Sequence, residues 1–375
     1  MPAGTGRVWT SPHGPRAVRA RVRPDERGRM RLRPGLRVLR RGPHGVQIGT
    51  DPRWAVVVDD LTAAEADALT TLGPAGDLGT LAARGVDPRR AARLAAQLDR
   101  AGLTVHARTR PRPPGPAVAE ATITALLGLG DVVGARSTRC VGVMGLGPVG
   151  LAIASTLAAA GVGTVLLDDA RPVRSVDVAP GGYGWGDVGA TRDAVATRRL
   201  RDVAPDVALT GGTPDVVVVV DLDVADPEQA PRLLASGVAH LSVVEREGDV
   251  VVGPLVVPGA AVCLRCLDLH RADLDPRWPD LAPQLADAVD DGGPAAARAG
   301  AGGVLAVAAV SAGIAAAGVL AHLDGGRSPL RGATYEVVAP YALPLRREWA
   351  AHPSCGCAAP PSRIGVPAAV SVSAD

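Results

Sequence analysis

Short apolar runs separated by glycine-containing turns follow one another between residues 140 and 169. Residues 141–144 form a short apolar run, which is typical of a strand buried on both faces of a sheet. An Ala- and Leu-rich segment at 151–160 has the composition of a compact helix, and Gly161 marks its end. A second apolar run follows at 165–167. The pattern predicts strand, turn, helix and strand in succession.

Helix and strand patterns keep alternating after residue 189. The continuous apolar run at 216–220, which ends at Asp221, is expected for a central strand of a parallel sheet. An α/β fold with a doubly wound, mostly parallel Rossmann-like sheet accommodates this order most economically. The segment 248–267 departs from the pattern and predicts extended structure that crosses to another part of the sheet. The other predicted elements are helices at 190–203 and 227–237 and strands at 206–210 and 239–245.

A separate and smaller pattern covers residues 32–108. It predicts a hairpin, a third strand, three helices and a closing strand, which together make a winged-helix-like α+β module. Asp60 or Thr62 is the expected cap of the first helix, and Asp87 with Pro88 begins the third. Such modules bind peptides, proteins or DNA, and some only pack against a neighbour. The mixture of Arg and Asp on the third helix favours a peptide or a protein.

The remaining segments complete the expected domain organisation. Residues 1–31 are rich in Arg, Pro and Gly without periodicity, so we expect a disordered tail. The Pro-rich stretch 109–118 predicts a linker. Residues 119–358 then form the Rossmann-like domain, and residues 359–375 form a flexible tail.

Composition narrows the possible functions. All 40 basic residues of the 375 are arginine, which excludes the Gly-Lys-Ser/Thr loop of P-loop NTPases. The formal net charge of +2 argues against a general nucleic-acid binder. The polar start of the chain does not resemble a secretory signal, which favours the cytoplasm. The apolar stretch 303–323 has the length of a membrane span, but its Ala, Gly and Ser content favours a buried, closely packed helix.

A glycine-rich turn separates the first predicted strand from its helix. Gly145, Gly147 and Gly150 have the G-x-G-x-x-G spacing, which lets a backbone turn tightly and approach a phosphate at a helix N-terminus. Asp168 ends the next strand, where a carboxylate can accept both hydroxyls of a ribose. The pattern predicts a nucleotide site. The alternatives are an ordinary strand-to-helix turn and the dinucleotide site of a dehydrogenase.

Four of the five cysteines form two tight pairs. Cys263 and Cys266 make a C-x-x-C motif, and Cys355 and Cys357 make a C-x-C motif. Two such pairs predict a closed, structural zinc site with four thiolate ligands. His352 is an alternative ligand in place of one cysteine.

The order of these motifs resembles the ubiquitin-activating-enzyme-like superfamily of the ThiF/MoeB type. The resemblance covers about residues 135–357. It is carried by GLGPVG, by Gly189 in VGATR, by Ala204-Pro205, by VVVVVD, and by GPLVVPGAAVCLRC with the late cysteine pair. It implies binding of Mg-ATP, adenylation of the carboxylate of a small partner protein or peptide, and a homodimer.

The resemblance assigns roles to single residues. Arg192 lies at the position of the family's phosphate-binding lysine, and Asp221 or Asp223 lies where a magnesium-binding aspartate is expected. The glycines and Asp168 keep the roles given above. The Asn-Leu-x-Arg-Gln loop of the family, expected near 176–182, reads VDVAPGG and contains neither the asparagine nor the arginine.

The module in front resembles the leader-peptide-binding part of azole-forming cyclodehydratases. In that group the ThiF-like domain has often become a scaffold, and a separate YcaO-type partner uses the ATP. A precursor peptide would add as a strand to the sheet edge of the module and rest against its third helix. Two functions follow from the sequence: an adenylyltransferase that activates a peptide or carrier protein, and a scaffold that presents a precursor peptide.

Overall fold

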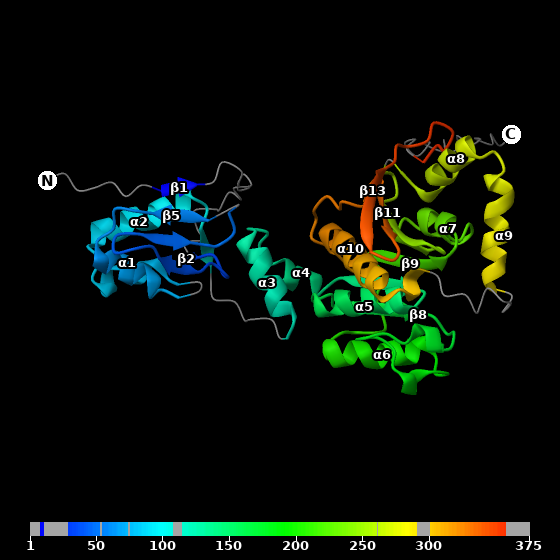
Figure 1. The fold of residues 1–375 in the computed structure, drawn as a ribbon, viewed down its shortest axis with the longest axis horizontal. Coiled ribbons are helices and arrows are strands. Elements are labelled where there is room, and N and C mark those ends of the chain that lie inside the picture. Colours follow the sequence, from blue (N-terminus) through cyan, green and yellow to red (C-terminus); the bar gives the residue numbers. More distant parts are fainter. Residues whose placement is uncertain are drawn as a thin grey trace, which may run out of the picture. The chain divides into compact units, whose positions relative to one another are not determined.

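The computed structural model describes residues 8–10, 29–52, 55–73, 76–107, 115–260, 262–290 and 301–357. The chain divides into two compact units, Met1–Gly134 and Ala135–Asp375, which are considered separately (Figure 1). The expected C-terminal tail 359–375 lies outside the described residues, as do most of the expected linker 109–118 and most of the expected disordered segment 1–31.

The first unit contains two antiparallel sheets and three helices (Figure 1). Its four-stranded sheet has the order β1-β5-β4-β3, and β2 pairs with β6. Part of the segment expected to be disordered is therefore structured, because β1 pairs with β5. The strands are β1 (Val8–Thr10), β2 (Arg29–Leu32), β3 (Val38–Arg40), β4 (Val46–Ile48), β5 (Val56–Val58) and β6 (Thr104–Ala107). The helices are α1 (Ala63–Thr70), α2 (Pro88–Arg100) and α3 (Ala117–Leu126), with short 3-10 turns at Leu78–Thr80 and Ala82–Arg84.

The helix caps in this unit follow from the sequence. The Thr62 hydroxyl accepts the backbone N–H of Glu65 at 3.2 Å, and the Glu65 carboxylate accepts the N–H of Thr62 at 2.9 Å. Asp87 accepts the N–H of Arg90 at 2.9 Å at the start of α2. Each cap satisfies an N–H group that has no partner within its helix, which fixes where α1 and α2 begin.

Helix α3 belongs to the first unit, although the sequence placed it at the start of the second domain. One contact that holds it there is a hydrogen bond of 2.7 Å from Arg33 Nη1 to the carbonyl of Leu126. The boundary between the compact units follows Gly134, within the short helix α4 (Val132–Arg136).

The second unit is built on a seven-stranded sheet with the order β13-β12-β11-β10-β9-β7-β8. The strands β8, β7, β9 and β10 are parallel, as the alternating pattern predicted. The strands β11, β12 and β13 extend the sheet in antiparallel pairing, which is where the predicted extended segment crosses. The strands are β7 (Cys140–Met144), β8 (Thr164–Asp168), β9 (Val216–Leu222), β10 (Ala239–Glu245), β11 (Asp249–Val256), β12 (Ala333–Val338) and β13 (Leu343–Glu348).

The strand expected at 206–210 is reduced to a single bridge between Thr164 and Ala208. Gly211 and Gly212 follow with φ angles of 82° and 86°, which turn the chain away before a ladder can form.

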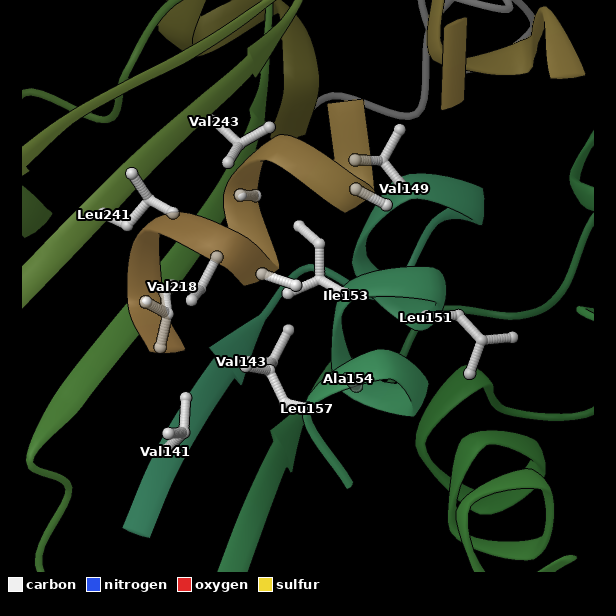
Figure 2. Close-up of a cluster of buried hydrophobic side chains, with 14 of the residues drawn as sticks. Val141, Val143, Val149, Leu151, Ile153, Ala154, Leu157, Val218, Leu241 and Val243 are labelled. Atoms are coloured by element: carbon white, nitrogen blue, oxygen red, sulfur yellow. The ribbon is translucent and has the colours of Figure 1, made fainter. Parts of the chain in front are cut away.

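Helices cover both faces of this sheet (Figure 1). Helices α5 and α10 pack against each other on one face, where Val143, Val218 and Leu241 point toward them (Figure 2). Helix α7 covers the opposite face, because its residues line a small cavity together with Val219 and Ser242 of the sheet. The chain therefore leaves β7 on one face and β9 on the other. The helices are α5 (Pro148–Ala159), α6 (Arg192–Val203), α7 (Gln229–Ala235), α8 (Leu264–Leu274), α9 (Trp278–Asp290) and α10 (Leu305–Leu323).

Helix α10 is long and apolar enough to cross a membrane by length and composition. In the structure it is a core helix: ten of its residues are buried, and it packs on α5, β11 and β12. A Cβ at Gly318 would overlap the side chain of Leu330, so the small residue permits close packing. The expectation of a buried, closely packed helix is confirmed.

Candidate functional site

The glycine turn lies at the carboxyl end of β7. Gly145 has a φ of 81°, and a Cβ there would overlap the carbonyl oxygen of Val220. A Cβ at Gly150 would overlap the carbonyl oxygen of Gly145, so this glycine brings helix α5 close to the turn. Gly147 is the N-cap residue of α5, and no side chain of the described residues caps this helix. The N-terminus of α5 therefore lies at the carboxyl edge of the sheet.

Asp168 lies beside this turn. It ends β8, pairs in register with Met144 at the end of β7, and its carbonyl oxygen accepts the N–H of Gly145 at 3.0 Å. Its side chain is exposed. The structure thus brings together the three glycines and the acid that the sequence separated by about 20 residues.

Arg192 is buried among carboxylates. Its Nη1 atom lies 3.1 Å from Asp169 Oδ2, and its Nη2 atom lies 2.6 Å from Asp177 Oδ2. Arg171 binds Asp169 from the other side at 2.7 Å, and Arg174 binds Asp177 at 3.3 Å. The guanidinium expected to bind phosphate therefore already has two carboxylate partners within the protein.

Asp169 connects this ion-pair network to the glycine turn. Its Oδ2 atom accepts the backbone N–H of Leu146 at 2.7 Å. Burial alone would raise the pKa of this carboxyl, but hydrogen bonds from Arg171 and Leu146 and the charge of Arg192 lower it to about 2. Asp169 is therefore ionised at neutral pH, and its hydrogen bond from Leu146 holds the backbone of the glycine turn in place.

The two candidate magnesium ligands lie apart from each other. Asp221 projects to the α7 face of the sheet, where it lines the cavity with His240 and Ser242 and accepts the N–H of Asp226 at 3.3 Å. Burial raises its pKa to about 7. Asp223 follows the end of β9 with a φ of 66°, and its N–H donates to the carbonyl of Glu245 at 2.7 Å.

Glu245 is a site residue that the motifs did not indicate. It ends β10 and projects to the α5 face, where its Oε1 atom lies 3.8 Å from the position of a Cβ on Gly147. A Cβ at Gly302, just before α10, would overlap the same carboxylate. Burial raises the pKa of Glu245 to about 7, although Arg192, Arg174 and Arg171 lower it. The only feature of the sequence that could have indicated Glu245 as a site residue is its position at the end of a predicted strand.

The four paired cysteines meet in one cluster. The Sγ atoms of Cys263 and Cys266 are 3.9 Å apart, those of Cys263 and Cys355 are 3.5 Å apart, and those of Cys266 and Cys357 are 3.4 Å apart. All four sulfurs lie within 4.8 Å of one another. Sulfurs at the corners of a zinc tetrahedron are about 3.8 Å apart for a Zn–S distance of about 2.3 Å. The geometry of the cluster fits a metal site of this type.

His352 lies beside the cysteines but is engaged elsewhere. Its Nδ1 atom accepts the N–H of Ser354 at 3.1 Å, and its Nε2 atom lies 2.9 Å from Asp273 Oδ2. His270 reaches the carbonyl of Ala350 at 3.0 Å and contacts the His352 ring edge-on. The alternative role of His352 as a fourth ligand is not needed, because four sulfurs are present. His270, Asp273 and His352 form a second group whose ligand atoms are close enough for a metal.

Solved structures of other proteins have a fold similar to that of this chain. No protein-family model matches the sequence, and no curated protein matches it. Among solved structures, Escherichia coli MccB has a TM-score of 0.61 and 14% identity, over 88% of this chain and 96% of that one. Its complex with ATP has a TM-score of 0.60 and 14% identity, over 88% and 99% of the two chains.

Two further structures match over similar lengths. The microcin C7 biosynthetic enzyme MccB in complex with N-formylated MccA has a TM-score of 0.60 at 13% identity, over 88% of this chain and 99% of that one. PaaA has a TM-score of 0.60 at 15% identity, over 84% and 98% of the two chains. At these identities the likeness establishes the fold. The chain has the fold of MccB and PaaA across nearly the whole length of those proteins, and the predicted resemblance to the ThiF/MoeB type is confirmed at that level.

Proposed function

We propose that this protein binds ATP at the glycine turn and activates the carboxylate of a peptide or small protein by adenylation. One observation carries the proposal: the N-terminus of α5, the glycine turn and Asp168 meet at the carboxyl end of the parallel strands. The chain leaves β7 and β9 on opposite faces, and ligands of doubly wound sheets bind at such a switch point. MccB, which has the same fold, has been solved with ATP.

The proposed reaction joins two anions. A carboxylate oxygen attacks the α-phosphorus of ATP, the bond from this phosphorus to the bridging oxygen breaks, and pyrophosphate leaves with the electron pair. The backbone N–H groups of the turn would hold phosphate, and Asp168 would accept the ribose hydroxyls. Arg192 and Asp221 or Asp223 are the candidate catalytic residues, with the aspartates as candidate ligands of magnesium, which would offset the developing charge.

The first unit is proposed to hold the peptide substrate. Strand β3 lies at one end of the four-stranded sheet, where an extended peptide can add as a further strand. The matched length of MccB includes most of this unit, and MccB has been solved with N-formylated MccA. Residues 32–108 would thus recognise the precursor, and the second unit would activate it.

The cysteine cluster is proposed to hold a structural zinc ion. Four thiolates leave no open position for water or substrate, so zinc would tie α8 to the chain around Cys355 and Cys357. A homodimer is a further expectation from the family, and a cytoplasmic location remains an expectation from the sequence.

The second candidate function is a peptide-presenting scaffold that works with a YcaO-type enzyme. A specific observation favours it: Arg192 is paired with Asp169 and Asp177, and residues 176–182 supply neither Asn nor Arg. A scaffold needs no cation to stabilise charge at phosphorus. It would still bind the precursor peptide.

Calorimetric titration of the purified full chain with ATP and Mg²⁺, followed by pyrophosphate exchange with candidate peptides, separates the two functions. An adenylyltransferase binds ATP and exchanges pyrophosphate only with the cognate peptide. In Asp168→Ala we expect about tenfold weaker ATP binding with the peptide affinity unchanged. Peptide binding without any ATP binding at millimolar concentration would support the scaffold and reject the enzyme.

A further inference from the structure

The charged groups around the glycine turn balance one another. Arg171, Arg174 and Arg192 supply three positive charges, and Asp169 and Asp177 supply two negative charges within the ion-pair network. Glu245 adds a third carboxylate, on which all three guanidinium groups act. With Glu245 ionised, which requires a pH above its raised pKa of about 7, these six groups carry no net charge; Asp168, beside the turn, is not one of the six.

The position of Glu245 brings this third carboxylate to the place where phosphate would bind. The register of β9 and β10 pairs Glu245 with Leu222 and Asp221 with Val244, so Glu245 and Asp221 project from opposite faces. Glu245 follows Leu241 and Val243 on the α5 side of the sheet. Its carboxylate lies near Gly147 at the N-terminus of α5 and directly against Gly302.

We infer that Glu245 is an internal counter-anion of the nucleotide site, which makes nucleotide binding depend on a divalent cation. This inference rests on the proposed function of the glycine turn. An ionised Glu245 cancels the net attraction that the three guanidinium groups would otherwise exert on a polyphosphate. A divalent cation that accompanies the nucleotide offsets both charges. Glu245 is thus a specificity residue that admits the metal complex of the nucleotide and rejects the free anion.

The same geometry gives a matched pair of variants. Glu245→Gln removes the charge and keeps the shape of the side chain, which leaves a net charge of +1 on the cluster. Asp215→Asn, just before β9, removes a charge at the amino end of the parallel strands, away from the glycine turn. Glu245→Asp keeps the charge but withdraws it from Gly147 by one methylene group.

The test is calorimetric titration of the zinc-loaded full chain with ATP, once with excess EDTA at a short contact time and once with Mg²⁺. For the wild type we expect binding with Mg²⁺ to be at least about tenfold tighter than without it. In Glu245→Gln we expect metal-free ATP to bind about tenfold or more tighter than in the wild type, so that the dependence on Mg²⁺ largely disappears. Asp215→Asn should keep the wild-type ratio, and Glu245→Asp should give an intermediate ratio.

The outcomes separate two failures. Binding of ATP by the wild type with an unchanged Mg²⁺ dependence in Glu245→Gln would overturn the role of Glu245 and leave the proposed function intact. No binding of ATP by the wild type under either condition would reject the proposed function, and the role of Glu245 with it. If Glu245→Gln does not show a cooperative thermal transition, Glu245→Asp is used in its place. A ratio of ATP affinities with and without Mg²⁺ in Glu245→Asp that equals the wild-type ratio would contradict the inference.

Discussion

The cysteine cluster and the glycine turn are two sites of the second unit with opposite internal organisation. The four sulfurs are 3.4–3.9 Å apart in the measured pairs, which is the spacing that a tetrahedral metal imposes. At the glycine turn the charged side chains instead satisfy one another, with Arg192 held between Asp169 and Asp177. One site has the geometry of a metal site that a ligand from outside would complete, and the other already supplies its own counter-charges.

This difference shows which parts of a site a sequence motif can predict. A C-x-x-C or C-x-C pair places two ligands together by local geometry, so two pairs need only be brought into contact. Charges at the ends of four parallel strands meet only after the sheet has formed, and their balance depends on every neighbour. Changes to the cysteines should therefore act on stability first, and changes near the glycine turn on binding as well.

The largest effect is expected from Cys266→Ser. Loss of one thiolate from a structural zinc site removes much of the binding energy that also stabilises the fold. We expect the loss of about one equivalent of bound zinc and a fall in melting temperature of more than about 10 °C, for a cost on the order of 5 kcal/mol. Zinc content by mass spectrometry and calorimetric melting measure the two effects. Cys140→Ser, at a buried thiol outside the cluster, should keep the zinc; equal loss in both variants would contradict the metal site.

The next effect is expected from Asp169→Asn. The change removes the negative charge that pairs with the guanidinium groups of Arg171 and Arg192 at a buried position. Breaking a buried ion pair lowers the free energy of unfolding by about 3–5 kcal/mol. Urea unfolding should show this cost, with zinc content unchanged. Asp206→Asn, at an exposed position, should change the free energy of unfolding by less than about 0.5 kcal/mol. A cost for Asp169→Asn as small as that of its control would show that the network is not a stabilising element.

A smaller loss of stability is expected from Gly150→Ala. The added Cβ would overlap the carbonyl oxygen of Gly145, so the turn must shift at a cost of about 1–3 kcal/mol. The shift should abolish ATP binding while the peptide still binds. Gly186→Ala, where a Cβ meets open space, should leave ATP binding unchanged. Titration calorimetry and thermal melting of both variants check this, and retained ATP affinity in Gly150→Ala would mean that the nucleotide does not use this turn.

The smallest effect is a change with pH in Asp221→Asn. The pKa of Asp221 is raised from 3.8 to about 7 by burial, so its proton stabilises the folded state at low pH, and this contribution is lost as pH rises toward 7. Relative to the wild type, the asparagine variant should therefore gain stability between pH 5 and pH 8, by on the order of 2 kcal/mol. Parallel urea unfolding of both proteins at several pH values measures the difference. A difference that is independent of pH would mean that the carboxyl titrates normally.

The sequence determined most of the architecture because the signals are local. The apolar runs at β7, β9 and β10, the caps Thr62 and Asp87, and the close glycines of the turn each act through neighbours in the chain. The same holds for the two cysteine pairs. Each of these features fixes backbone geometry or ligand spacing over a few residues.

Only the tertiary structure decided which charges meet. The roles of Asp169, Asp177 and Glu245 depend on the order of the strands in the sheet and on the side of the sheet to which each residue points. The family resemblance placed Arg192 at a phosphate and Asp221 or Asp223 at a metal, whereas folding pairs Arg192 with carboxylates and turns Asp221 to the α7 face. The physical reason is that an electrostatic interaction depends on distance and burial, and neither is defined until segments far apart in the chain have packed.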